Sequence, residues 1–322
     1  MRKRVVAVRR LHAAHLEQLK REFYVDHFPD LDAGNAARFR EALYEAHGLI
    51  GGKLMVTPQM LDDAPNLEVI ATISVGYDNF PVEEMTRRGI LLCNTPDVLT
   101  ETTADTGFAL IMAAARRVPE LDRFVRQGHW QMHIDEPHFG RDVHGKTLGL
   151  IGMGRIGAAV ARRGALGFGM SVVYSNASPK PHLEAELGAQ HCSLNELLEC
   201  SDFVCVTVPL TNETRHLIGR DAFRRMQRSA ILINIARGPV VEEGALIQAL
   251  QEGWIAGAGL DVYEREPLAA DSPLLQLPQV VALPHIGSAT HETRAAMAQC
   301  AVDNLLHALR GERPPNSVNG NA

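Results

Sequence analysis

The chain is 322 residues long, which favours two domains over a single core. Apolar residues make up 46% of it and charged residues 22%, the balance of a globular protein rather than of a disordered chain or a fibrous repeat. The 32 Lys and Arg residues against 38 Asp and Glu residues give a net charge of −6. Nucleic acid is therefore not an expected partner, because that binding depends on cations that neutralise phosphates.

The first residues and the cysteines indicate a cytoplasmic protein without a membrane partner. Only four apolar residues, 5–8, separate the basic start from Arg9, and this is too short for the apolar core of a signal peptide. No apolar run reaches the ~18 residues that span a membrane. There is no Cys-x-x-Cys pair, so we expect reduced thiols and neither disulfides nor a metal site. The cysteines are Cys93, Cys192, Cys200, Cys205 and Cys300.

Strand-like and helix-like segments alternate from the first residues to about residue 100. Apolar, β-branched segments predict short buried strands, and apolar residues three or four positions apart predict helices. The predicted strands are 4–8, 48–51, 67–73 and 90–93, and the predicted helices are 11–21, 36–46 and 82–88. Repeated units of this length favour a parallel sheet with helices on both faces.

A long helix and a loop interrupt this alternation. Residues 101–117 have apolar side chains at helical spacing, and Pro119 kinks or interrupts the helix before the pattern resumes at Leu121. Residues 127–141, rich in His, aromatic residues and proline, are predicted to form a loop.

A second alternating series starts at Thr147. The predicted strands are 147–151, 171–175, 202–208, 230–235, 255–260 and 280–283, with helices between most of them. The last helix is expected to begin near His291 and to end before Gly311 and the two prolines that follow it.

The segment 148–157 contains a dinucleotide fingerprint, because an apolar strand leads directly into Gly-x-Gly-x-x-Gly and an Ala-rich helix. Gly152 allows the tight turn, Gly154 lets a pyrophosphate approach the backbone, and Gly157 lets the helix pack closely on the strand. The N-terminus of the helix adds free N–H groups and a positive dipole end. The alternative is a glycine-rich turn that binds nothing.

The acidic residue that an NAD site places about 20 residues further on is missing. The second strand leads into Ser175 and Asn176, and no carboxylate occurs before Glu184. A carboxylate there would repel a 2′-phosphate, whereas Ser175, Asn176, Ser178 and Lys180 are able to donate hydrogen bonds to one. These residues predict NADP as the preferred cofactor, with NAD possible if the segment is only a polar turn.

Three polar residues each follow a predicted strand of the second series: Arg237, Glu266 and His285. Ligand clefts of open parallel sheets form just past the carboxyl ends of the strands. Any one of these residues alone is more often a solvated or structural group. Together, and with the glycine fingerprint, they predict a catalytic site.

The surrounding motifs resemble those of the D-isomer-specific 2-hydroxyacid dehydrogenase family over nearly the whole chain. They are Ala-Arg-Gly at 236–238, Gly-Leu-Asp-Val at 259–262 with Glu-Pro at 266–267, and Pro-His-Ile-Gly at 284–287. Within the family the chain resembles most the bacterial 2-ketoaldonate reductases, which act on 2-ketogluconate, glyoxylate and hydroxypyruvate. Further matching stretches are 73–79, 98–102, 142–147 and 284–294.

The resemblance implies a role for each catalytic candidate. His285 would be the general acid that protonates the keto oxygen as NAD(P)H delivers hydride, and Glu266 would orient the imidazole and favour its protonated form. Arg237 would bind the 2-keto acid and stabilise charge on the reacting oxygen. The expected product is the D-2-hydroxy acid.

The resemblance also implies binding residues for the substrate and the cofactor. Substrate binding is expected from Arg237, His285, Lys53, Leu54 and the backbone N–H groups of Val75 and Gly76. Asp261 would face the nicotinamide carboxamide. The other matching cofactor positions are Thr103, Arg155, Ile156, Pro209, Thr214, Ile235 and Ser288. NADPH-preferring relatives often have Arg just after the second strand, where this chain has Ala177 and Ser178.

The implied fold is α/β, with two Rossmann-like or flavodoxin-like doubly wound parallel-sheet domains and an interdomain cleft. Residues 1–100 and 285–322 would form a discontinuous substrate domain, and residues 101–284 the dinucleotide-binding Rossmann domain. Residues 101–145 would be a hinge helix and a dimerisation arm. The apolar and aromatic character of the loop 128–134 agrees with a homodimer, because exposed patches of that kind mark interfaces.

Other functions remain open. A non-catalytic NAD(P)-sensing protein on this fold would keep the glycines and lose the acid–base pair, which this chain retains. A reductase of 2-keto-6-phosphogluconate would need extra cations for the phosphate, and Lys53 is one candidate. Oxidation of phosphite on this fold is a third alternative.

Overall fold

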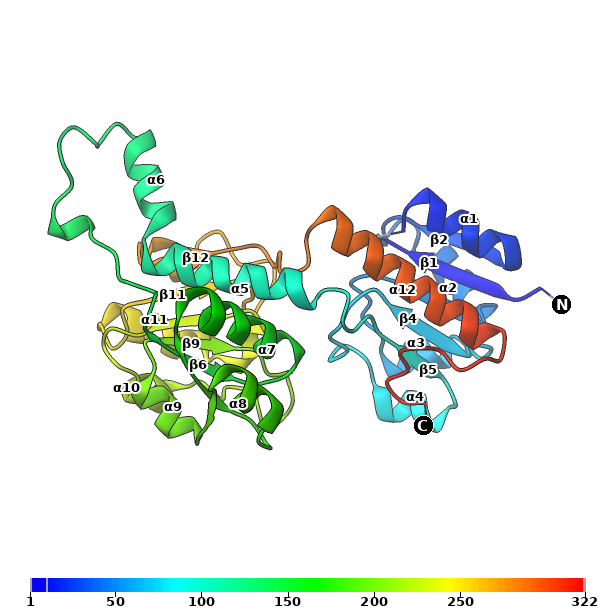
Figure 1. The fold of residues 1–322 in the computed structure, drawn as a ribbon. Helices are drawn as coiled ribbons and strands as arrows, with labels where there is room; N and C mark the ends of the chain where they lie inside the picture. Colours follow the sequence, from blue (N-terminus) through cyan, green and yellow to red (C-terminus); the bar gives the residue numbers. More distant parts are fainter. Residues whose placement is uncertain (1, 10, 321–322) are drawn as a thin grey trace. The chain divides into compact units, whose positions relative to one another are not determined.

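The computed structural model describes residues 2–9 and 11–320, which form two compact units (Figure 1). One unit consists of residues 1–99 and 288–322, and the other of residues 100–287. Among the described residues, none of the helices has the length and apolar character required to cross a membrane.

The first unit is a five-stranded parallel sheet in the order β2-β1-β3-β4-β5, the flavodoxin-like arrangement. The strands are β1 (Arg4–Val8), β2 (Tyr24–Phe28), β3 (Gly48–Gly51), β4 (Val69–Thr72) and β5 (Leu91–Cys93). The middle strands β3 and β4 are fully buried, as expected for strands covered on both faces.

Helices cover both faces of this sheet. They are α1 (Ala13–Glu22), α2 (Ala36–Tyr44), α3 (Pro58–Asp62), α4 (Val82–Arg87) and α12 (His291–Leu309). Phe39 of α2, Leu61 of α3 and Met85 of α4 share one buried cluster with alternate strand residues. Helix α12 packs on the sheet through Leu305 and Leu309, which lie against Gly48.

The second unit is a seven-stranded parallel sheet in the order β12-β11-β10-β9-β6-β7-β8. The strands are β6 (Thr147–Ile151), β7 (Ser171–Ser175), β8 (Gln190–His191), β9 (Phe203–Val206), β10 (Ile231–Asn234), β11 (Gly257–Leu260) and β12 (Val280–Ala282). The chain extends from β6 first to β7 and β8, and then in the opposite direction from β9 to β12. The strand order therefore reverses between β6 and β9, the position where doubly wound sheets bind dinucleotides.

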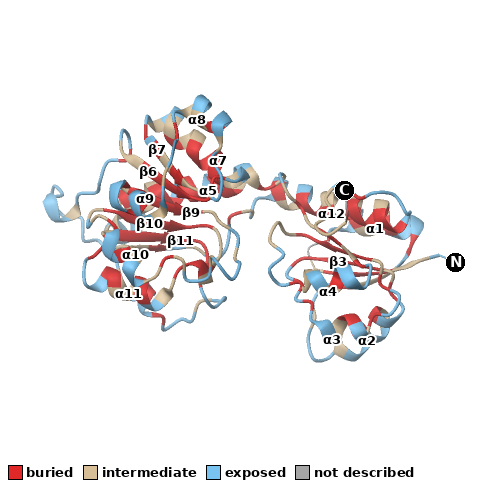
Figure 2. Ribbon diagram, turned by 90° about the horizontal axis from the view of Figure 1, so that it is seen from below, coloured by how far each residue is buried: buried red, intermediate tan, exposed pale blue. Residues whose placement is uncertain are grey.

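Two buried layers flank the second sheet, and Figure 2 shows its strands as buried between helices whose outer surfaces are exposed. Helices α5 (Thr100–Ala115) and α7 (Arg155–Arg162) contribute to one layer, together with Leu183 of α8 (Pro181–Leu187). Helices α9 (Leu194–Cys200), α10 (Arg220–Arg225) and α11 (Glu243–Gln251) contribute to the other.

An extended arm leaves the second unit at the end of α5. Arg117 adopts a left-handed conformation with φ of 54°, and a separate helix, α6 (Val118–Arg126), begins there with Pro119 in its first turn. Helix α6 has no buried residue, and Figure 1 shows it and the following loop extending away from the sheet. The single helix predicted for 101–117 therefore ends at Ala115, earlier than expected.

The sequence did not predict two of the strands. β2 lies at the edge of its sheet, and only its last residue is fully buried, so its polar Asp26 and His27 hide the strand pattern. β8 is a two-residue exposed edge strand. Edge strands are less constrained to be apolar than central ones, which is why both escaped a prediction based on hydrophobic patterns.

Candidate active site

The three catalytic candidates lie on neighbouring loops of the second unit. β10 leads to Arg237, β11 to Glu266 and β12 to His285. These strands are adjacent and parallel, so their carboxyl ends meet at one edge of the sheet.

His285 and Glu266 form a direct ion pair. Nδ1 of His285 lies 2.7 Å from Oε2 of Glu266, and the other carboxylate oxygen accepts a hydrogen bond of 3.2 Å from the N–H of Tyr263. The imidazole side chain is 48% exposed. With Nδ1 held by the carboxylate, Nε2 is the nitrogen that is left to exchange a proton with a bound molecule.

The charge of Glu266 is maintained by its neighbours. Burial by itself would raise the pKa of this carboxyl group, but the hydrogen bond and the charge of His285, the N–H of Tyr263 and the charge of Arg237 outweigh it. The net result is a pKa below its ordinary value of 4.5, so Glu266 is ionised at neutral pH.

Asp261 fixes the turn that carries His285. His285 itself has a φ of 56°, a left-handed conformation that is unfavourable for a side chain of its size. The buried carboxylate of Asp261 accepts the N–H of Ile286 at 2.7 Å and that of Gly287 at 2.8 Å. Burial raises the pKa of Asp261 despite these two hydrogen bonds. Its predicted contact with a nicotinamide carboxamide stays a prediction.

The loop of Arg237 is shaped by Asn234, which the sequence analysis missed. The buried amide of Asn234 donates to the carbonyl of Arg237 at 3.1 Å and accepts the N–H of Ala236 at 3.1 Å. The guanidinium of Arg237 donates to the carbonyl of Ala236 at 2.8 Å. A signal was present, because Asn234 is a polar residue at the end of an otherwise apolar strand.

The backbone of Gly238 packs directly against the loop of Glu266. A Cβ atom at Gly238 would lie 1.8 Å from the carbonyl carbon and oxygen of Tyr263, so only glycine fits. Tyr263 also donates its hydroxyl to the carbonyl of Leu283 at 2.9 Å, just before His285. The Ala-Arg-Gly motif is thus part of the packing that brings the three loops together.

The glycine turn after β6 has the features that a dinucleotide pyrophosphate requires. Gly152 has a φ of 99°, and its N–H donates to the carbonyl of Ser175 at 2.9 Å. A Cβ at Gly157 would lie 2.2 Å from the carbonyl oxygen of Gly152, whereas a Cβ at Gly154 would meet no atom within 4 Å. Gly154 precedes α7, so an open glycine stands in front of the free N–H groups of a helix.

The segment after β7 is tied to this glycine turn. The side chain of Asn176 accepts the N–H of Met153 at 3.3 Å and donates to the carbonyl of Ser178 at 2.9 Å, so it is committed to the loop itself. The N–H of Lys180 donates to the hydroxyl of Tyr174 at 2.6 Å. Of the predicted 2′-phosphate residues, Ser175 and Lys180 therefore remain the better candidates for side-chain contact.

The other cofactor candidates occupy several loops of the second unit. Thr103 lies beside Gly287, and the buried Ile235 packs against Gly107 of α5. The hydroxyl of Thr214 donates to the carbonyl of Pro209 at 2.7 Å. Arg155 and Ile156 begin α7. Ser288 belongs to the other unit.

The predicted substrate residues of the first unit follow two paired strands. Lys53 and Leu54 come after β3, and Val75 and Gly76 come after its neighbour β4. The turn of Val75 is held by Asn94, whose side chain donates to its carbonyl at 2.9 Å. Lys53 is exposed, but the side chain of Leu54 is buried in the core, so only its backbone is available to a substrate.

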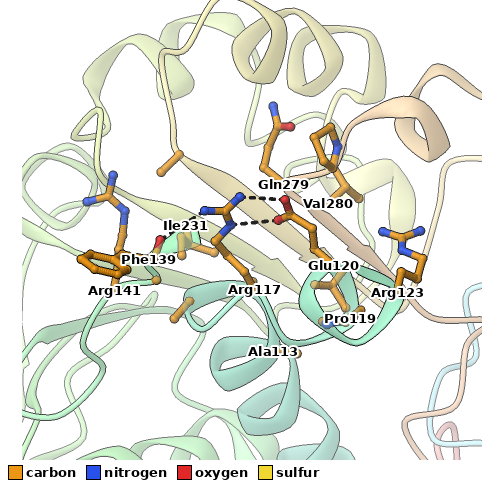
Figure 3. Close-up of a pocket in the computed structure, with 16 residues that line it drawn as sticks. Ala113, Arg117, Pro119, Glu120, Arg123, Phe139, Arg141, Ile231, Gln279 and Val280 are labelled. Atoms are coloured by element: carbon orange, nitrogen blue, oxygen red, sulfur yellow. Dashed lines mark hydrogen bonds and ion pairs between the residues drawn. The ribbon is translucent and has the colours of Figure 1, made fainter. Parts of the chain in front are cut away.

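A cavity of about 340 Å³ lies at the other edge of the second sheet, where β10, β11 and β12 begin (Figure 3). Arg117 and Glu120 face one another in it and form two hydrogen bonds of 2.9 and 2.7 Å. No predicted site residue is among the residues that line it. The cavity belongs to the base of the arm and not to the catalytic edge.

Comparisons with known proteins identify the family to which the chain belongs. Residues 108–287 match the model of the D-isomer specific 2-hydroxyacid dehydrogenase, NAD binding domain. The chain belongs to the D-isomer specific 2-hydroxyacid dehydrogenase family. It is therefore an oxidoreductase, and the predicted family and fold class, two parallel-sheet α/β domains, are confirmed.

The similar proteins resemble this dehydrogenase over almost its whole length. Glyoxylate/hydroxypyruvate reductase B of Yersinia pestis (strain Pestoides F) is 54% identical over 303 residues, which are 94% of this chain and 93% of that protein. The NADPH-dependent glyoxylate/hydroxypyruvate reductase of Sinorhizobium meliloti, solved with NADP and malonate, is 35% identical with a TM-score of 0.86, covering 99% of this chain and 97% of that one. A crystal structure of a Thermus thermophilus protein is 44% identical with a TM-score of 0.90, covering 98% of this chain and 99% of that one.

The glycine turn makes a testable distinction between two of its residues. We expect Gly157→Ala to lower the free energy of unfolding by about 1–3 kcal/mol, because its Cβ collides with backbone. Gly154→Ala, the matched control, should cost less than about 1 kcal/mol but should weaken NADPH binding. Urea unfolding and cofactor titration of both variants measure this. Equal stability of the two variants would contradict the packing role of Gly157.

Proposed function

We propose that this dehydrogenase reduces glyoxylate and hydroxypyruvate, and longer 2-keto acids such as 2-ketogluconate, to the D-2-hydroxy acids. The observation that carries the proposal is the contact of 2.7 Å between His285 and Glu266, whose carboxylate also interacts with the charge of Arg237. These residues follow the carboxyl ends of adjacent strands, in a sheet with the strand order of dinucleotide-binding domains. The names of the relatives support the substrate class. They do not favour a reductase of 2-keto-6-phosphogluconate.

His285 acts as the general acid in this proposal. Its Nδ1 is held by Glu266, so the proton given to the keto oxygen comes from Nε2. The carboxylate of Glu266 stabilises the protonated imidazole and fixes the plane of the ring. The bound nicotinamide cofactor supplies the hydride.

Arg237 binds the keto acid and stabilises negative charge on the oxygen that is being protonated. Its planar guanidinium matches a 2-keto acid, which presents two oxygens side by side. The backbone N–H groups of Val75 and Gly76, which follow β4 of the first unit, would hold the substrate carboxylate, and Lys53 follows the paired strand β3. Residues 1–100 and 285–322 would thus serve the substrate, and residues 101–284 the cofactor.

NADPH is the preferred cofactor in this proposal, and NADH is accepted. The open Gly154 and the N-terminus of α7 suit a pyrophosphate. Ser175 stands where an NAD-specific enzyme has an acid, and Lys180 adds a positive charge. The relative from Sinorhizobium meliloti is named as NADPH-dependent and was solved with NADP.

We also propose a cytoplasmic homodimer. The arm carries six exposed large apolar residues, and a second copy of the chain is the simplest partner to cover them. They are Val118 and Val125 of α6, and Trp130, Met132, Ile134 and Phe139 of the loop that follows. Burial raises the pKa of Cys93 and Cys205 to about 12, so both are protonated core thiols, as suits a reducing compartment.

The acid–base pair is tested by two substitutions. His285→Ala should lower kcat for glyoxylate reduction by about 10²–10⁴-fold, within the range of general acid catalysis, and should leave NADPH binding intact. Glu266→Gln keeps the shape but removes the negative charge beside the imidazole, so kcat for glyoxylate reduction should also fall.

For the wild type, the midpoint of the loss caused by protonation of Glu266 should lie below pH 4.5, because the pKa of this group is lowered. Steady-state rates across the pH range measure both effects. A near-normal kcat in His285→Ala, or an unchanged kcat in Glu266→Gln, would remove these residues from the mechanism.

Cofactor preference depends on Ser175 in this proposal. Ser175→Asp places a carboxylate beside the 2′-phosphate, and we expect kcat/KM for NADPH to fall roughly tenfold relative to NADH. Ser175→Asn is the neutral control and should keep most of the preference. Paired kinetics with both cofactors decide the matter, and a wild type that prefers NADH would refute the assignment.

The arm is tested by the mass of the protein in solution. Light scattering at micromolar concentration should give twice the mass of one chain, and Trp130→Ala should weaken the dimer because it removes the largest exposed apolar side chain of the arm. Met55→Ala, an exposed apolar residue of the first unit, is the control and should leave the mass unchanged. A monomeric wild type would end the dimer proposal.

A further inference from the structure

A second His–carboxylate pair lies close in the chain to the catalytic one. Nε2 of His216 is 2.7 Å from Oε1 of Glu264, two residues before Glu266. The two side chains are 46% and 34% exposed. His216 belongs to the segment between β9 and α10, and the proposed reaction assigns no role to either residue.

The backbone of His216 is bonded to the loop that follows Arg237. Its N–H donates to the carbonyl of Pro239 at 2.8 Å, and Ile218 forms a parallel bridge with Val241. His216 has a φ of 53°, a conformation that costs free energy for a residue with a side chain. His216 therefore has a strained backbone conformation, and the segment 216–218 is hydrogen-bonded to the Arg237 loop.

The side chain of His216 reaches the other catalytic loop through Glu264. Oε1 of Glu264 also accepts the N–H of Glu243 at 3.4 Å, and the N–H of Glu264 donates to Oε2 of Glu243 at 3.2 Å. The neighbouring N–H of Tyr263 donates to Glu266. A displacement of Glu264 would thus be passed directly to the carboxylate that orients His285.

We propose that His216 and Glu264 are positioning residues, which hold the Arg237 loop and the Glu266 loop in their mutual arrangement for keto-acid reduction. The backbone of His216 is attached to one loop and its imidazole to the other. The two loops are already in contact through Gly238 and Tyr263. In this proposal, the pair of His216 and Glu264 keeps the two loops from shifting along that contact. The inference rests on the proposed function, because it assumes that Arg237 and Glu266 act on the substrate.

The energetic expectation separates positioning from simple stabilisation. A His–carboxylate pair that is exposed to this extent contributes little to global stability. In contrast, a displacement of about 1 Å in a catalytic group lowers the rate by as much as ~10²-fold. Loss of the pair should therefore lower kcat strongly and change the free energy of unfolding only slightly.

The test uses His216→Ala, Glu264→Ala and the double variant in the full-length protein, with glyoxylate and NADPH as substrates. Each single variant should lower kcat about 10-fold or more, with an unfolding midpoint in urea close to that of the wild type. The double variant should be no slower than the slower single variant, because both changes remove the same interaction. Glu264→Gln, which still accepts a hydrogen bond from the imidazole, should recover most of the lost kcat.

His307→Ala is the matched control, since His307 is also partly exposed and lies 3.8 Å from a carboxylate, that of Glu312, on a helix of the first unit. It should retain the wild-type kcat. If His216→Ala does not fold, the comparison of Glu264→Ala with Glu264→Gln carries the test.

Several results would overturn the positioning role while leaving the proposed function intact. They are a wild-type kcat in both single variants, multiplicative losses in the double variant, and a loss of kcat that only follows a loss of folded protein. A wild-type enzyme that reduces neither glyoxylate nor hydroxypyruvate would instead overturn the proposed function.

Discussion

The backbone of Gly238 lies against the backbone of Tyr263 and Glu264 so closely that no side chain fits between them. This contact joins the loop after β10 to the loop after β11 and places Arg237 near Glu266. The charge of Arg237 helps to lower the pKa of Glu266. Glu266 in turn holds His285. The arrangement of the three polar residues therefore depends on one approach of backbone to backbone, which the parallel order of β10, β11 and β12 makes possible.

Buried polar groups stabilise the unfavourable conformation of His285. A left-handed residue of this kind costs about 1–3 kcal/mol, and hydrogen bonds to a charged group contribute about 1.5–3 kcal/mol each. Asp261 makes two such bonds to the residues that follow His285 and so opposes the strain, while the burial of its carboxylate costs free energy. The carboxylate is buried, and each of its two oxygens accepts one of these N–H groups. The turn and the acid thus support one another.

The two edges of the seven-stranded sheet have different characters. The carboxyl edge holds the glycine turn and the three polar residues, while the amino edge holds the cavity of Arg117 and Glu120 and the base of the arm. Helix α6 buries none of its own residues, so its apolar side chains need another surface. The proposed dimer and the proposed chemistry are tested by separate measurements.

Local patterns in the sequence were enough to predict the alternating α/β order, most of the central strands and three polar candidates that the structure places on neighbouring loops. Central strands are buried on both faces and must be apolar throughout, and the glycines of the nucleotide turn are required by backbone geometry, so both leave a strong local pattern. The polar candidates could be predicted because each directly follows such a strand.

The contacts that position those candidates became visible only in the folded chain. Asn234 bonds to Arg237, Asp261 to the turn of His285, and His216 to Glu264. The last two contacts join residues that are far apart in the chain. The first depends on the direction in which the side chain of Asn234 points. The early end of α5 at Ala115 and the polar edge strand β2 were equally hidden. All of these features escaped prediction for the same physical reason. They depend on packing between elements, whereas hydrophobic periodicity indicates only which face of each element is buried.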